Sequence, residues 1–260
     1  MTDIQLGSFD APMNVMIQGA SRGIGAAFCA ALGGSPSVAH VIATSRDPDS
    51  SEALAAVRRD MGDRLVTVPL DVTSEARIEA AARVIAERVE RLSLIINCAG
   101  LLHDGDAVRP ERRLSEVTPE ALQRSFAVNA WGPLLVAKHF AGLLPRRERA
   151  VFASLSARVG SIGDNRLGGW YAYRASKAAQ NMLTKNLSIE LPRRHRGTLV
   201  VALHPGTVDT GLSAPFQSRV PEEQLFDAPR AARQLLGVID GLGDDDNGGF
   251  FAWDGQRIVW

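Results

Sequence analysis

The sequence predicts a single α/β domain: a doubly wound, mostly parallel sheet of seven strands with helices on both faces. The main observation is that short, unbroken apolar runs alternate with longer helical patterns. Such runs suit strands that are buried on both faces, and strands that alternate with helices form right-handed β–α–β units. The composition agrees: 260 residues, 45% apolar and 22% charged, match a globular domain that needs no disulfide or metal to hold its core.

Seven apolar runs are the expected strands. They cover residues 15–17, 38–43, 65–68, 94–96, 151–153, 199–203 and 250–253. Because no linker or internal repeat divides the chain, we expect residues 1–260 to form one domain.

Three of the expected helices carry clear local signals. The first has one apolar stripe at spacings of four and three residues. This stripe consists of Ile78, Ala82, Ile85, Val89 and Leu92. A second helix is expected to begin at Thr118 and Pro119, a cap followed by proline at the first helical position. A third is expected from about residue 171 to residue 190, ending before Pro192.

Two segments lack a periodic pattern. Residues 1–12 carry Asp3 and Asp10 and no apolar core, so they are expected to be an N-terminal tail and not a signal peptide. Residues 211–227 contain Pro215 and Pro221 and are expected to be a long surface loop. Long loops often act as lids, so this segment is either a substrate-binding lid or an ordinary irregular connection.

Charge and cysteine content exclude several classes of partner. Acidic and basic residues balance at 29 each, which argues against a nucleic-acid or membrane-surface partner. No apolar run approaches the 18 residues of a membrane span. Cys29 and Cys98 are far apart and indicate reduced thiols in the cytoplasm. The five histidines show no ligand spacing, so no metal site is expected.

A glycine-rich turn follows the first strand directly. It consists of Gly19, Ala20, Ser21, Arg22, Gly23, Ile24 and Gly25 and leads into a helix. Glycine allows a tight turn and a close approach of backbone to a ligand. The unpaired N–H groups and the positive dipole end of the helix suit a pyrophosphate. A plain glycine turn without a ligand is the structural alternative.

The same stretch also matches the G-x-S-x-G nucleophile elbow of α/β-hydrolases, with Asp164 and His204 following in the right order. That interpretation is disfavoured because the elbow needs strands and an oxyanion loop upstream. Only a short tail precedes this turn, and Gly25 would have no role.

The end of the second strand indicates which dinucleotide is bound. In dinucleotide-binding domains, an acid about 20 residues after the glycines holds a free ribose 2′-hydroxyl, whereas an arginine accepts a 2′-phosphate. Here Ser45 and Arg46 occupy this place, and Arg22 is a second cation. A guanidinium binds phosphate well, so the sequence favours NADP over NAD. Alternatively, both arginines are solvated surface charges.

Tyr173 and Lys177 stand four residues apart on an expected helix and therefore share one face. A nearby ammonium favours the phenolate and lowers the pKa of a phenol. We therefore expect Tyr173 to act as a general acid/base near neutral pH. The structural alternative is an ordinary pair on a helix surface.

Taken together, these motifs resemble the short-chain dehydrogenase/reductase superfamily. In family order they are Gly19, Gly23 and Gly25; Asn97-Cys98-Ala99-Gly100; Asn129; Ser156; Tyr173 and Lys177; and Pro205-Gly206. Residues 168–174 and 250–255 resemble the C-factor/sniffer-like carbonyl reductase branch. Gln18 and Cys98 depart from the family pattern, which holds threonine and asparagine there.

The resemblance implies a Rossmann fold and assigns roles to residues. Asn129, Ser156, Tyr173 and Lys177 would be catalytic: Tyr173 transfers the proton, Lys177 lowers its pKa and holds the nicotinamide ribose, Ser156 polarises the carbonyl, and Asn129 holds a water. Ser154 and Ser161 are alternatives to Ser156. The implied cofactor contacts are Gly19, Ser21, Arg22, Gly23, Ile24, Gly25, Ser45, Arg46, Asp71, Val72, Asn97, Ala99, Gly100, Tyr173, Lys177, Pro205, Gly206, Val208 and Thr210.

The implied function is hydride transfer between NADP(H) and a ketone, an aldehyde or a secondary alcohol. The alternative is an NADP(H)-binding sensor or cell–cell signalling protein of the C-factor type with little or no turnover, because a fold does not determine a function. The expected partners are a small carbonyl or alcohol substrate and, as in many family members, further copies of the chain in a homodimer or homotetramer.

Overall fold

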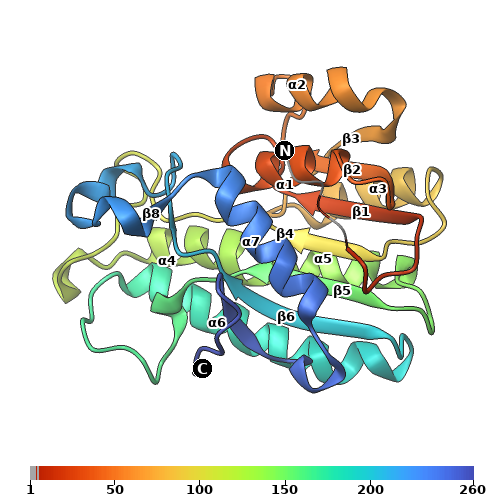
Figure 1. The fold of residues 1–260 in the computed structure, drawn as a ribbon. Coiled ribbons are helices and arrows are strands. Elements are labelled where there is room, and N and C mark those ends of the chain that lie inside the picture. The colour runs from red at the N-terminus through yellow and green to blue at the C-terminus, as the bar shows by residue number, and fades with distance from the viewer. Residues whose placement is uncertain (1–3, 5) are drawn as a thin grey trace.

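The centre of the structure is a parallel sheet with strand order β3-β2-β1-β4-β5-β6-β9 (Figure 1). The computed structural model describes residue 4 and residues 6–260. The strands are β1 (Met13–Gln18), β2 (Val38–Ser45), β3 (Leu65–Pro69), β4 (Leu94–Asn97), β5 (Ala150–Leu155), β6 (Thr198–His204) and β9 (Phe250–Ala252). All six neighbouring pairs are parallel. The expected fold class is confirmed, and of the expected strand residues only Trp253 lies outside these strands.

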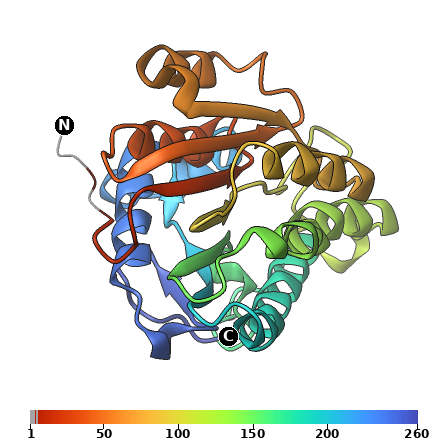
Figure 2. The same cartoon turned by 90° about the vertical axis from the view of Figure 1, so that its right-hand side faces the viewer.

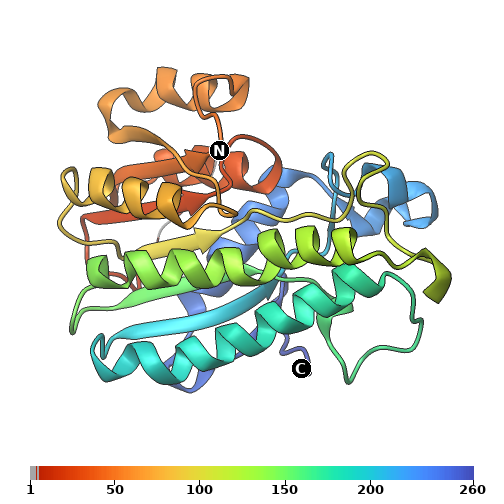
Figure 3. The same ribbon diagram turned by 180° about the vertical axis from the view of Figure 1, so that it is seen from behind.

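Helices cover both faces of this sheet, as Figure 2 shows from one end. One face carries α1 (Gly23–Gly33), α2 (Glu52–Met61) and α7 (Ala228–Gly241). The other carries α3 (Glu75–Ala86), α5 (Gly132–Phe140) and α6 (Tyr171–Glu190), with α4 (Pro119–Phe126) packed beside α6 (Figure 3). The chain runs outward from β1 to β3 and then returns to the opposite side of β1 with β4. In doubly wound sheets, ligands bind at such a reversal, here at the carboxyl ends of β1 and β4, and this place is called the crevice below.

Alternating side chains of β1 explain why both of its faces are apolar. Val15 and Ile17 pack with α1 and α7, whereas Met16 packs with α3 and α5 on the other face. All three side chains are fully buried. Each such burial contributes about 1.5–3 kcal/mol, so the unbroken apolar run is needed to hold the two helical layers.

The three helix predictions fare differently. The limits of α6 agree with the expected range. Thr118 caps α4 as expected, because its hydroxyl accepts a hydrogen bond from Ala121 N at 3.2 Å. The expected stripe through Leu92 is too long for α3, which ends at Ala86. Val89 and Leu92 are nevertheless buried, because the chain after the helix turns back onto the same core.

The two segments without periodicity are more ordered than expected. In the described part of the N-terminal tail, Leu6 and Phe9 are buried in the core beneath α7, and Asp3 lies outside the described residues. Residues 211–227 include 3-10 turns at Ala214–Arg219 and Glu222–Gln224. They also include β8 (Leu225–Phe226), which pairs with β7 (Thr207–Val208). Short turns and two-residue strands leave no apolar repeat in a sequence, so periodicity could not reveal them.

No helix in the described part of the chain is both long enough and apolar enough to span a membrane.

Candidate active site

The glycine turn lies at the crevice where the strand order reverses. Gly19 has φ +84°, and a Cβ at this position would lie 2.6 Å from the nitrogen of Ala99. A Cβ at Gly25 would lie 2.1 Å from the Gly19 carbonyl oxygen. Only glycine fits at either position, so the turn brings the ends of β1 and β4 and the start of α1 into close contact.

The start of α1 leaves its first N–H groups open to a ligand. Arg22 is the N-cap residue and makes no side-chain cap hydrogen bond, and its side chain is exposed. The preceding loop is held from α2, because the Ser51 hydroxyl donates to the Ser21 carbonyl oxygen at 2.6 Å. A fixed loop with open N–H groups and a positive dipole end suits a phosphate group.

Ser45 and Arg46 lie at the end of β2, beside Asp71. The Ser45 hydroxyl is buried without a hydrogen-bond partner among the described residues, and Arg46 is exposed. Partial burial raises the pKa of Asp71, but two hydrogen bonds from Thr73 and the charges of Arg46 and Arg77 outweigh it and lower the pKa below its ordinary value. An unpartnered hydroxyl and an exposed guanidinium together could hold a phosphate.

Gln18, at the end of β1, holds the segment that follows β4. Gln18 accepts from Ala99 N at 3.3 Å through Oε1, and its backbone oxygen accepts from Cys98 N at 2.8 Å. Asn97 is turned toward β5, where it donates to the Ala153 oxygen. Burial raises the pKa of the Cys98 thiol well above its ordinary value, so this cysteine is not a ready nucleophile.

Asn129 joins the crevice to α6. It lies in a π-helical turn, Ala127–Trp131, between α4 and α5, and such turns are frequent at functional sites. Its Oδ1 accepts from Leu101 N at 2.7 Å, and its Nδ2 donates to the Leu101 oxygen and to Ser176 Oγ. Ser176 Oγ in turn donates to the Tyr173 carbonyl oxygen at 2.9 Å. A continuous set of hydrogen bonds therefore links Asn129 to the turn that bears Tyr173.

Tyr173 and Lys177 lie on successive turns of α6, and both are buried. The Lys177 ammonium donates to the Leu155 carbonyl oxygen at 2.8 Å and to Gln180 Oε1 at 2.9 Å. It lies 5.9 Å from the centre of the Tyr173 ring. Tyr173 and Lys177 therefore share one face of α6, as expected, but this face is buried in the protein.

Burial dominates the titration of both side chains. It raises the pKa of Tyr173 above its ordinary value and lowers the pKa of Lys177 to about 7. The sequence predicted the opposite direction for the tyrosine, and that prediction was wrong for this structure. Removal from water disfavours the charged form of each group.

The three candidate serines all have partners within the protein. Ser156 donates to Asn181 Oδ1 on α6 at 2.6 Å. Ser154 accepts from Asn97, and Ser161 accepts from the backbone of Asp164. The structure thus places Ser156 against α6, one turn beyond Lys177.

The other side of the crevice comes from the chain after β6. A Cβ at Gly23 would lie 3.2 Å from Thr210 Cγ2. A Cβ at Gly100 would lie 3.5 Å from Leu212 Cδ1, 3.7 Å from Asn129 Oδ1 and 4.0 Å from Lys177 Nζ. Gly100, Asn129 and Lys177 therefore lie close to one another, and Thr210 lies close to the glycine turn.

Val72 and Gly206, two further predicted cofactor contacts, also pack against neighbouring elements. Val72 packs against Gly132 of α5, and Gly206 approaches the rings of Phe226 and Trp253.

Sequence reasoning missed four polar side chains that hold the site together: Gln18, Ser176, Gln180 and Asn181. Gln180 and Asn181 follow Lys177 by three and four residues, a spacing that puts them on its face of the helix. That spacing was the available signal.

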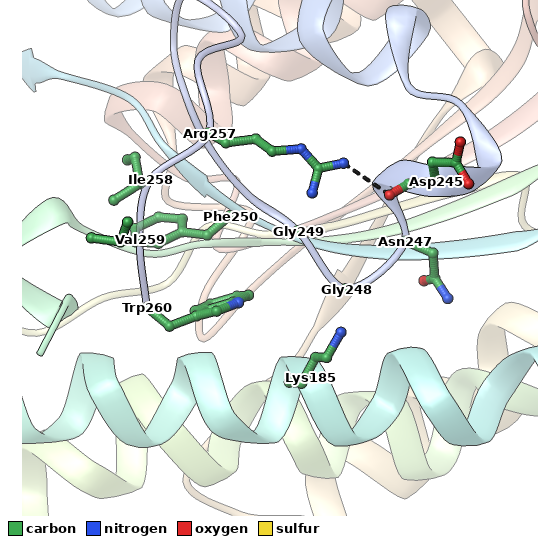
Figure 4. A pocket seen from close by; sticks show the side chains of 10 residues that line it. All are labelled: Lys185, Asp245, Asn247, Gly248, Gly249, Phe250, Arg257, Ile258, Val259 and Trp260. Carbon is green, nitrogen blue, oxygen red and sulfur yellow. Dashed lines mark hydrogen bonds between the residues drawn. The ribbon is translucent and has the colours of Figure 1, made fainter. Parts of the chain in front are cut away.

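A separate cavity of about 400 Å³ lies between α6 and the C-terminal residues (Figure 4). Lys185 projects into it from α6, and Arg257 donates to the backbone oxygen of Asp245 beside it. None of its lining residues belongs to the predicted site.

Within the described residues, no three His, Cys, Asp or Glu side chains are placed to hold a metal ion.

Comparison with known sequences agrees with this geometry. Residues 13–221 match the family model described as short chain dehydrogenase. The chain is 32% identical over 235 residues to 1-hydroxy-2-glutathionyl-2-methyl-3-butene dehydrogenase of Rhodococcus sp. (strain AD45), covering 88% of this chain and 97% of that protein. It is 37% identical over 147 residues to the C-signal of Myxococcus xanthus, covering 56% of this chain and 83% of that protein.

Two solved structures share the whole fold. The NADPH-bound carbonyl reductase from chicken fatty liver has a TM-score of 0.83 and 29% identity, and the match covers 98% of this chain and 97% of that one. The carbonyl reductase Sniffer of D. melanogaster has a TM-score of 0.83 and 26% identity, covering 96% and 100%. The resemblance to the C-factor/sniffer-like branch is confirmed, and the chain belongs to the short-chain dehydrogenase/reductase family.

Proposed function

We propose that this protein is an NADP(H)-dependent oxidoreductase that transfers hydride between the nicotinamide and a ketone, an aldehyde or a secondary alcohol. One observation carries the proposal: Tyr173 and Lys177 share a face of α6, and a Cβ at Gly100 would lie within 4.0 Å of both Asn129 Oδ1 and Lys177 Nζ. A proton donor at a dinucleotide crevice is what carbonyl reduction requires. The family's oxidoreductase activity and the carbonyl reductase structures support it.

The residues of the crevice fit the cofactor. Gly19 and Gly25 leave space for no side chain, and the start of α1 offers open N–H groups. Ser45, Arg46 and Arg22 would hold a 2′-phosphate, and the NADPH-bound chicken structure supports this choice over NAD. When bound, the cofactor would supply or accept the hydride.

The protein's own part is to move a proton. The buried phenol of Tyr173 would donate its proton to the carbonyl oxygen as negative charge develops there, and would take it back in the reverse reaction. Lys177, with a pKa of about 7, can gain or lose a proton near neutral pH. Leu155 and Gln180 hold its ammonium in place. Asn129 would then position a water that connects the lysine to solvent.

Ser156 remains the proposed polarising residue. To reach a carbonyl oxygen, its hydroxyl has to exchange the hydrogen bond to Asn181 for one to the substrate. A donor aimed at the oxygen where charge develops favours the transition state over the ground state.

A second candidate function is NADP(H)-dependent sensing or signalling with little turnover. The similarity to the C-signal of Myxococcus xanthus favours it. Tight NADPH binding together with no turnover across a panel of carbonyl compounds would support this alternative. For either function, the free thiols Cys29 and Cys98 support a place in the cytoplasm.

Tyr173→Phe tests the proton donor. The variant keeps the ring but lacks the hydroxyl, so we expect kcat for carbonyl reduction to fall by about 100-fold or more. NADPH affinity should stay nearly unchanged. The loss of NADPH absorbance measures turnover, and the cofactor's fluorescence measures binding. Turnover close to that of the wild type would exclude this mechanism.

Alanine variants of the three serines identify the polarising residue. Ser156→Ala should lower kcat by about 100-fold, as expected for the loss of one donor to a developing oxyanion. Ser154→Ala and Ser161→Ala should retain most activity. If Ser161→Ala lowers kcat while Ser156→Ala does not, the role belongs to Ser161.

Arg46→Ala and Arg22→Ala test the cofactor choice. A hydrogen bond to a charged group contributes about 1.5–3 kcal/mol, so each variant should lower the ratio of kcat/KM for NADPH to that for NADH by about 10-fold or more. Arg88→Ala, which removes an exposed arginine between α3 and β4, serves as the control. An unchanged ratio in both test variants would mean that the arginines are merely solvated.

Lys177→Met tests the burial of the amine without any substrate. The pKa of Lys177 is about 7 in the folded protein and 10.5 ordinarily, so between these values the unfolded chain binds the additional proton. Raising the pH therefore favours the folded wild type. Its free energy of unfolding should rise relative to that of Lys177→Met by up to about 1.4 kcal/mol per pH unit.

Urea unfolding at several pH values between 7 and 10 measures this difference. Tyr173 and both cysteines are present in the two proteins, so their titrations cancel. Parallel stability curves for wild type and Lys177→Met would show that the lysine is not held in the buried state described here.

A further inference from the structure

The helix that bears Tyr173 begins in an unusual way. Trp170, its N-cap residue, has φ 50° and ψ 45° and makes no side-chain cap hydrogen bond. Among the described residues it is the only non-glycine residue with positive φ. A bulky side chain in the left-handed region is strained, and such strain persists only where surrounding contacts hold it.

Glu111, about 60 residues upstream, supplies the contacts that hold this helix start. Its backbone oxygen accepts from Trp170 N at 2.5 Å, and its Oε2 accepts from Ala172 N at 3.2 Å. A Cβ at Gly169 would lie 3.3 Å from the same backbone oxygen, so the two segments pack closely. The Glu111 carboxylate thus caps α6 from a distant loop, where it also faces the positive end of the helix dipole.

The turn fixed in this way is the one that carries the proposed proton donor. The ring of Trp170 lies edge-on to the ring of Tyr173, with centroids 6.3 Å apart, and lies 5.2 Å from the ring of Phe216. From the other end, Ser176 binds the Tyr173 carbonyl and is itself bound by Asn129. Tyr173 is therefore held between Glu111 on one side and the Asn129 network on the other.

The loop that carries Glu111 also contacts the rest of the site. Leu101, near its start, is bound at both backbone groups by Asn129. His103 shares a hydrogen bond of 2.9 Å with the Gly211 carbonyl oxygen and lies edge-on to Phe216. The loop between β4 and Leu114 thus contacts Asn129, the 211–227 segment and the start of α6.

Burial of Glu111 is not explained by packing alone. The residue is 3% exposed, and its Oε1 has no hydrogen-bond partner among the described residues. Burying a carboxyl group with one oxygen unpaired is unfavourable. The bond from Oε2 to the helix start is the contact that offsets this burial.

We propose that Glu111 is a positioning residue of the active site: it caps α6 and thereby sets the place of Tyr173 relative to Lys177. Glu111 contacts neither substrate nor cofactor in this role. The assignment rests on the proposed function, because it treats Tyr173 as the proton donor.

Three variants test it, with kcat, KM, NADPH affinity and the pH profile of kcat as readouts. Glu111→Ala removes the cap, and a displaced catalytic group can lower the rate by up to about 100-fold. We expect at least a 10-fold loss of kcat with NADPH affinity within about 2-fold of wild type. The pKa that governs kcat should also shift.

Glu111→Gln keeps an acceptor oxygen and should restore most of the rate and the original pH profile. Glu120→Ala, which removes an exposed acid in the first turn of α4, should behave as wild type.

Amide hydrogen exchange adds a readout that is independent of catalysis. Exchange at Ala172 and Tyr173 should be faster in Glu111→Ala than in wild type and should return toward wild type in Glu111→Gln. If Glu111→Ala does not fold, Glu111→Asp, which shortens the side chain by one carbon, should show the same losses to a smaller degree.

Different results would overturn the role of Glu111 and the proposed function. A variant without the carboxylate cap that keeps wild-type kcat, pH profile and exchange overturns the role of Glu111. Wild-type protein that binds NADPH but reduces no carbonyl compound overturns the proposed function, whereas the exchange experiment then still decides whether Glu111 fixes the start of α6.

Discussion

Burial of a phenol and an amine on successive turns of α6 is the constraint on which the rest of the site depends. Away from water, neither group carries charge readily, so the pKa of Tyr173 rises above its ordinary value and the pKa of Lys177 falls to about 7. An amine in this state needs polar partners, and Leu155 and Gln180 supply them. The contacts of Ser176 and Glu111 hold the backbone of the turn that carries Tyr173.

The sheet supplies the other half of the arrangement. Reversal of strand order at β1 opens the crevice, and the close approach of Gly19 to Ala99 brings a helix start and the end of β4 to its edge. The apolar strands hold α1 and α6 on opposite faces, so the glycine turn and the proposed proton-transfer groups come to one edge of the sheet without being close in sequence. Glu111 and Asn129 then fix the helix turn that points at this edge.

Particular residues show how far local patterns extend. The spacing of Tyr173 and Lys177 predicted their shared face on α6, and the glycines predicted a tight turn after β1, because helix periodicity and tight turns are local properties. The direction of the Tyr173 pKa was predicted wrongly, because burial comes from segments far away in sequence. The Ser156 contact with Asn181 was equally hidden, since it depends on how β5 packs against α6.

By itself, the sequence determined the alternation of strands and helices, the turn that suits a phosphate, and the pairing of tyrosine with lysine. Each of these three features depends only on residues that are close together in the sequence. Only the tertiary structure decided which groups lose contact with water, which partners hold Lys177, and that the start of α6 is capped by Glu111 from a distant loop. Desolvation and long-range hydrogen bonds depend on packing in three dimensions, and no short stretch of sequence records them.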